Sequence, residues 1–198
     1  MVNLEPPFRP ATIDDAPVLA ELVNYAGEGL PHYLWGTLVE PGEDAWDVGL
    51  RRATREEGSF SYRNAAIIER DGQCAGCLIG YEIPDDPEPI ADDMPAMFVP
   101  LQQLENLVPG TWYVNVLAVR PQFRGQGLGT HLLDLADTTA QSLGKSGLSV
   151  IVSDANAGAR LLYERCGYSQ SATRPMVKEG WQNDGQLWVL LAKGLKRP

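Results

Sequence analysis

The sequence lacks any long apolar run, and no stretch approaches the roughly 18 consecutive apolar residues that a membrane-spanning helix requires. No membrane association is therefore expected. The opening Met1–Glu5 is also unlike a secretory signal peptide, because it is acidic and prolines follow it directly. A cytoplasmic location is the resulting expectation.

Positive charge is scarce: 16 Lys and Arg residues stand against 26 Asp and Glu residues, which gives a formal net charge of −10. Such a surface repels a phosphate backbone, so nucleic acid is not an expected partner. The same charge would attract a cationic amine, although many proteins are acidic for solubility alone.

Cysteine is scarce as well. Three residues indicate a reducing compartment without a disulfide framework. Cys74 and Cys77 have the spacing of a metal-binding pair, yet they lie in an apolar strand pattern, where residues three apart face opposite sides. No second cysteine pair or nearby histidine completes a tetrahedral site. We therefore expect buried small side chains and no metal.

The length of 198 residues fits one domain over 1–198. Hydrophobic periodicity predicts an α/β fold, a mixed sheet with helices on both faces. Residues 84–110 are rich in proline and acidic residues, which predicts a long irregular insertion, with a short helix within Met97–Leu107. The expected strands lie near Pro7–Arg9 and at Ala65–Arg70, Gln73–Glu82, Thr111–Val119, Leu148–Ser153, Ser171–Val177 and Gln186–Leu191. The expected helices are Ile13–Glu28, Ala45–Glu56, Gly127–Leu143 and Asn156–Arg165, with Pro31–Trp35 as a loop or half-turn.

The most informative segment is Gln122–Thr130, which reads Gln-Phe-Arg-Gly-Gln-Gly-Leu-Gly-Thr between an expected strand and an expected helix. Its glycines let the backbone approach a ligand without a Cβ in the way. Free N–H groups, the helix dipole and the charge of Arg124 together form an anion site. A phosphorylated ligand is therefore expected.

Two commoner glycine loops do not fit this segment. A dinucleotide fingerprint requires glycine where the chain has Thr130, and a P-loop requires Gly-Lys-Ser/Thr, whereas no lysine is near. What remains is Arg-x-x-Gly-x-Gly, formed by Arg124, Gly127 and Gly129.

This pattern resembles the pyrophosphate-binding motif of the GCN5-related N-acetyltransferase (GNAT) superfamily, which holds acetyl-CoA. Two further segments match in the expected order. Arg9–Ala16 resembles the opening of these enzymes, and Asn156–Tyr168 resembles their later Asn and Tyr-x-x-x-Gly-Phe/Tyr motif. The resemblance implies the GNAT fold, in which the central strands splay around acetyl-CoA as co-substrate.

The resemblance also implies a set of cofactor contacts. Backbone groups of Leu117 and Val119 would pair with the pantetheine arm, and their side chains would join the core together with that of Ala118. Asn156 is a strong helix N-cap type, and the resemblance adds a hydrogen bond from its amide to the cofactor. The backbone expected to hold the pyrophosphate comprises Arg124, Gly125, Gln126, Gly127, Leu128, Gly129 and Thr130.

By the same resemblance, Tyr163 is the general acid that protonates the departing thiolate; a buried structural tyrosine is the alternative. The amine must also lose a proton before attack. Tyr113 and Asn115 could order a water there but are not competent bases near neutrality. Glu82 is the candidate carboxylate base, and His32 is a second candidate or an exposed loop histidine.

The expected activity is N-acetylation of a primary amine, of a small molecule or a peptide, by direct transfer from acetyl-CoA in a ternary complex. His32, Tyr33 and Trp35 would shape the acceptor pocket together with Tyr113 and Asn115. A non-catalytic acyl-CoA-binding or sensor domain and an acyltransferase for longer acyl chains stay open as alternatives. The C-terminal hairpin and the insertion could build a homodimer.

Overall fold

A computed structural model describes residues 4–195, which form two compact units of two stretches each. Unit 1 comprises the chain up to Gly80 together with Asn115–Leu132, and unit 2 comprises Tyr81–Val114 together with the chain from Leu133 onward. The expectation of one domain over 1–198 stays a prediction.

Unit 1 contains the N-terminal part of the sheet. The strands β1 (Phe8–Pro10), β2 (Ala65–Arg70) and β3 (Gln73–Glu82) pair antiparallel, and β4 (Thr111–Val119) follows β3 in the strand order. The β2–β3 hairpin has the predicted bounds. Its turn residues Asp71 and Gly72 have φ values of 51° and 72°, as a type I′ turn requires.

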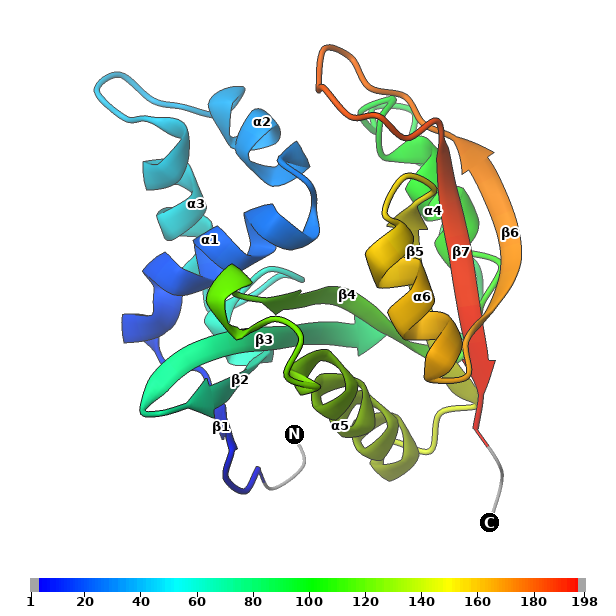
Figure 1. Cartoon of the computed structure of the whole chain (residues 1–198). Coiled ribbons are helices and arrows are strands. Elements are labelled where there is room, and N and C mark those ends of the chain that lie inside the picture. Colours follow the sequence, from blue (N-terminus) through cyan, green and yellow to red (C-terminus); the bar gives the residue numbers. More distant parts are fainter. Residues whose placement is uncertain (1–3, 196–198) are drawn as a thin grey trace. The chain divides into compact units, whose positions relative to one another are not determined.

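Three helices belong to unit 1 (Figure 1): α1 (Ala16–Ala26), α2 (Leu30–Gly36) and α3 (Ala45–Ala53). The carboxylate of Asp44 begins α3 by accepting the backbone N–H groups of Trp46 and Asp47. Apolar faces of these helices and of the strands share one core. Its fully buried members include Ala16, Leu19, Leu22, Ala53, Ile67, Cys77 and Ile79.

The prediction of a loop or half-turn at Pro31–Trp35 is wrong, because these residues lie inside α2. Proline fixes φ near the helical value and lacks only an N–H that the first helical turn leaves unpaired, so Pro31 starts this helix instead of interrupting it. The chain reverses before it, at Glu28 and Gly29, which have positive φ. The first helix accordingly ends at Ala26 and not at Glu28.

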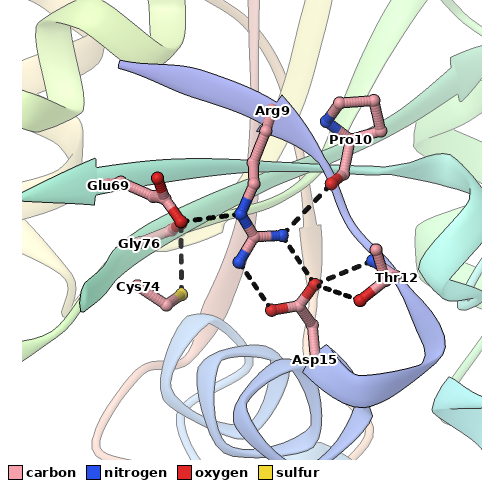
Figure 2. A network of polar contacts seen from close by, with 7 residues as sticks. All are labelled: Arg9, Pro10, Thr12, Asp15, Glu69, Cys74 and Gly76. Carbon is pink, nitrogen blue, oxygen red and sulfur yellow. Dashed lines mark hydrogen bonds and ion pairs between the residues drawn. The ribbon is translucent and has the colours of Figure 1, made fainter. Parts of the chain in front are cut away.

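A polar network joins the N-terminal strand to the first helix (Figure 2). The guanidinium of Arg9 donates to both carboxylate oxygens of Asp15 at 2.7 and 2.8 Å, and to Glu69 of β2 at 2.7 Å. Asp15 also accepts the backbone N–H of Thr12 at 2.7 Å. This network fixes the turn Ile13–Asp15 that leads into α1.

Replacing Asp15 by asparagine should lower the free energy of unfolding by about 2 kcal/mol, because hydrogen bonds to a charged partner are lost at a buried site. The hydrogen bonds from Arg9 lower the pKa of Asp15 in the folded state. Its contribution is therefore present above the unfolded pKa of about 4 and is lost as the pH falls through the folded pKa. Urea unfolding at neutral and acidic pH would measure this. Asp14→Asn, at the exposed neighbouring position, is the matched control, and equal losses in both variants would contradict the prediction.

Unit 2 contains the C-terminal part of the sheet. The first residues of β4 pair parallel with β5 (Gly147–Ser153), which pairs antiparallel with β7 (Leu187–Gly194), and β6 (Ser169–Pro175) lies beyond β7. Helix α6 (Ala157–Arg165) lies in front of this sheet in Figure 1, and α4 (Val99–Glu105) contacts β6 and β7. The helix expected within Met97–Leu107 is thereby confirmed.

The last hairpin differs from its prediction. Its strands begin at Ser169 and Leu187, whereas Ser171 and Gln186 were expected. The carboxylate of Asp154 accepts the backbone N–H groups of Gln186 and Leu187 at 2.8 and 3.2 Å, so a contact across 32 or more residues sets the start of β7.

The long helix α5 (Leu128–Ser142) follows β4 and a 3₁₀ turn at Pro121–Phe123. Apart from the additional helix α2, the strands and helices follow one another in the expected order, and the sheet contains parallel and antiparallel pairs, which confirms the mixed α/β sheet. Over residues 4–195, none of the helices has the length and apolar character that crossing a bilayer demands.

Candidate functional site

The glycine loop of unit 1 has the geometry of a ligand cradle. Gly125 and Gly127 have φ values of 74° and 79°, in the left-handed region that favours glycine. A Cβ added at either position would meet no protein atom within 4 Å. The residues from Arg124 to Gly127 are exposed, and α5 begins directly after them at Leu128. The loop therefore presents bare backbone at a helix N-terminus, where N–H groups lack partners within the helix.

The loop is tied at both ends. The side chain of Arg124 donates through Nε to the carbonyl of Val119 at 3.0 Å, and the carbonyl of Gly127 accepts the N–H groups of Thr130 and His131. Arg124 thus anchors the loop to the end of β4, while its charge stays at the exposed surface. Gln126 is exposed, and Gly129 lies within the first helical turn.

The strand before the loop alternates between two environments. Val116 and Ala118 are buried in the core of unit 1, as expected for Ala118. Asn115, Leu117 and Val119 are half-buried on the other side, so the side chains of Leu117 and Val119 do not join the core as expected. Backbone pairing of Leu117 and Val119 with a ligand stays a prediction.

In unit 2, Asn156 and Tyr163 are both held by α6. The side-chain oxygen of Asn156 accepts the N–H of Ala159 at 3.1 Å, so the N-cap role is confirmed. Tyr163 follows two turns later and is buried at 5% exposure, with its ring 5.5 Å from that of Tyr168. Burial raises the pKa of Tyr163 well above its usual value, so its phenol stays protonated at neutral pH and can donate a proton.

Glu82 lies at the end of β3 with its side chain about half exposed, and it forms an ion pair with Lys145. The expected role of Glu82 as the base stays a prediction.

A second carboxylate, Glu105, lies close by and was missed in the sequence. The hydroxyl of Tyr81 lies 3.2 Å from each of its carboxylate oxygens. Burial raises the pKa of Glu105 to about 7, and the nearby charge of Glu88 adds to the shift. Glu105 lies in the proline-rich insertion, where no periodicity singles out one acidic residue among several, and its partner is 24 positions earlier.

Glu105 borders a cavity of about 110 Å³ within unit 2. The remaining lining residues are Tyr81, Glu82, Ile83, Pro84, Asp86, Pro87, Glu88, Gln102, Asn106 and Pro109. The ring of Tyr113, itself buried, lies 5.2 Å from that of Tyr81, and burial holds its pKa far above the usual range. Tyr113 is therefore a neutral phenol, consistent with its exclusion as a base.

Three of the five residues expected to shape an acceptor pocket, His32, Tyr33 and Trp35, lie on α2 of unit 1. Trp35 is buried at 3% exposure and stacks on Phe60, so the structure places it in the core. His32 and Tyr33 are half-buried. The ring of His32 lies 4.9 Å from that of Trp46, on α3.

The three cysteines form no disulfide. Cys77 is fully buried in the core of unit 1, while Cys74 and Cys166 are half-buried. Burial raises the pKa of both Cys74 and Cys77, which disfavours the reactive thiolate.

Comparison with known proteins places the chain in a family. The family model described as acetyltransferase (GNAT) family matches residues 30–168. A comparison with curated protein sequences gave no match.

Solved structures resemble the chain over most of its length. A crystal structure described as that of an acetyltransferase is 25% identical, with a TM-score of 0.67 over 96% of this chain and 99% of the other. An N-acetyltransferase from Staphylococcus aureus Mu50 is 17% identical, with a TM-score of 0.61 over 93% of this chain and 98% of the other. A GNAT family acetyltransferase from Elizabethkingia anophelis with acetyl-CoA bound is 16% identical, with a TM-score of 0.50 over 66% of this chain and 75% of the other. The chain therefore belongs to the acetyltransferase (GNAT) family.

Proposed function

We propose that this protein is an acetyl-CoA-dependent N-acetyltransferase that transfers the acetyl group to a primary amine by direct transfer in a ternary complex. The observation that carries this proposal is the exposed loop of left-handed glycines at the junction of β4 and α5. Such a loop suits a diphosphate, because backbone N–H groups and the helix dipole both favour an anion. The acetyl-CoA bound in the Elizabethkingia anophelis relative supports the same ligand.

The chemistry that we assign to this chain uses few side chains. Backbone groups of Arg124–Thr130 hold the diphosphate, and those of Leu117 and Val119 hold the pantetheine arm. The amine attacks the thioester carbon, and Tyr163 donates its proton to the departing sulfur. Most of the acceleration would come from holding the amine and the thioester together. The acceptor is a small-molecule or peptide amine, which the acidic surface favours if it is cationic.

Calorimetry with acetyl-CoA and thiol release over a panel of amines test this proposal. We expect binding and turnover with at least one amine. Binding without turnover on any amine would favour a non-catalytic acyl-CoA-binding domain, and faster turnover with a longer acyl-CoA would favour a different acyl donor. No binding of either would refute the assignment of the loop.

Gly127→Ala should weaken acetyl-CoA binding by about tenfold or more, because its methyl group would project into the space that the loop keeps open. Strain alone should cost about 1–2 kcal/mol of stability, since alanine disfavours the left-handed region. Gly144→Ala is a matched control, since Gly144 also has positive φ and open space around it but lies outside the loop. Equal acetyl-CoA affinity in the two variants, measured by calorimetry, would contradict the prediction.

A further inference from the structure

Glu105 is a carboxylate that the mechanism above does not use, although it lies in a cavity of the same unit as Tyr163. Glu105 is the last residue of α4. The side chain of the next residue, Asn106, accepts the N–H of Glu88 at 3.1 Å and donates to the carbonyl of Glu88 at 2.8 Å, which fixes the insertion at that position. The cavity wall around Glu105 is therefore held by hydrogen bonds on both sides.

The groups that face Glu105 are acidic or neutral. Tyr81 of β3 donates to it, and Glu88 faces it from the insertion. Lys145 is paired with Glu82, which also lines the cavity. Arg174 of β6, which packs against α4, donates to Gln103 instead. Within residues 4–195, no cationic side chain forms an ion pair with Glu105. A positively charged ligand in the cavity would therefore be the first cation to pair with this carboxylate.

Glu105 is linked to the proposed acid through Tyr113. The ring of Tyr113 packs against that of Tyr81, and Glu105 and Tyr163 both contribute to raising the pKa of its phenol. Glu105, which borders the cavity, and Tyr163 thus both lie close enough to Tyr113 in unit 2 to influence its pKa. The pKa of about 7 leaves Glu105 able to accept a proton near neutral pH, where a general base is most effective.

We propose that Glu105 is the proton acceptor for the incoming ammonium substrate in this cavity, and that Tyr81 is its positioning residue. This rests on the proposed N-acetyltransferase function. The ammonium gives one proton to the carboxylate of Glu105 and becomes the neutral amine. Its lone pair forms the C–N bond, the C–S bond breaks, and the sulfur takes the proton of Tyr163. The phenolate recovers a proton from the nitrogen, and Glu105 releases its own to solvent.

The test is the pH dependence of kcat/KM for the amine at saturating acetyl-CoA. In the natural protein it should be low at acidic pH, rise through an apparent pKa of about 7 as Glu105 ionises, and then level off. In Glu105→Gln it should fall about 100-fold at neutral pH and climb without a plateau, following the free-amine fraction. Acetyl-CoA affinity should not change.

Tyr81→Phe is the second variant, and it leaves the carboxylate of Glu105 in place. The hydrogen bond from Tyr81 lowers the pKa of Glu105, so its removal should move the rise in kcat/KM to higher pH and preserve the plateau within a few fold. A merely structural role would lower the plateau without moving the rise. Gln103→Ala, on the same helix but directed to Arg174, is the matched control and should leave the profile unchanged.

The outcomes separate the two proposals. Turnover with an unchanged profile in both Glu105→Gln and Tyr81→Phe would overturn the role of Glu105 alone. Loss of the rise in Glu82→Gln, with the rise retained in Glu105→Gln, would assign the base to Glu82. Absence of turnover by the natural protein across the amine panel would overturn the proposed function and this role together.

Discussion

Tyr163→Phe should lower kcat by about 10²–10⁴-fold, the range typical of a lost general acid. The substitution removes only the hydroxyl group, and the ring keeps its packing against Tyr168. Because Tyr163 is buried and its pKa is raised, the hydroxyl is a neutral donor throughout the working pH range. Acetyl-CoA affinity should change little, since we assign cofactor binding to backbone groups. Single-turnover measurements of thiol release would isolate the chemical step.

Tyr168→Phe is the matched control for this variant. Tyr168 is equally buried, and its hydroxyl has no hydrogen-bond partner among residues 4–195. Removing that hydroxyl should leave turnover unchanged and should not reduce stability, because an unpaired buried polar group is unfavourable. If Tyr163→Phe retained the turnover of the natural protein, Tyr163 would be a packing residue and another group would have to protonate the sulfur.

Local signals predicted those parts of the fold that neighbouring residues determine. Asp71-Gly72 specifies the β2–β3 hairpin because both turn residues adopt positive φ, and Asn156 specifies the start of α6 because its side chain caps the helix directly. The prediction at Pro31 is wrong because proline interrupts a helix in its interior but favours one in its first turn. The start of β7 depends on Asp154, which no local pattern could reveal.

The candidate site shows the same division. The glycine loop can be predicted from the sequence because the groups that form it lie in consecutive residues, from Arg124 to Thr130. The surroundings of each acidic side chain cannot be predicted from the sequence, because they depend on partners far along the chain. Lys145 is paired with Glu82 across 63 positions, and Tyr81 with Glu105 across 24. The burial that raises the pKa of Glu105 likewise depends on the folded structure.

The strand that leads to the glycine loop depends on a close backbone approach at Gly76. β3 has a bulge beside this residue, where its register with β2 shifts and the carbonyl of Ala75 accepts the N–H of Arg120 at 2.8 Å. A Cβ added to Gly76 would lie 2.4 Å from the carbonyl oxygen of Ala118 and 3.2 Å from the Cα of Val119. These atoms belong to the backbone of β4, so no side-chain rotation can relieve the overlap.

Gly76→Ala should therefore destabilise unit 1 by roughly 3 kcal/mol, at the upper end of the usual cost of overpacking, because β3 and β4 must separate to admit one methyl group. Loss of acetyl-CoA binding should accompany it, since the shift falls on the residues whose backbone we assign to the pantetheine arm. Gly36→Ala is the control: Gly36 ends α2, has open space around its Cα, and should become neutral or slightly more stable as alanine. Denaturant unfolding of both variants measures the difference. Equal stability in the two would mean that β4 yields at Ala118, and that the position of this strand is not what holds the cofactor.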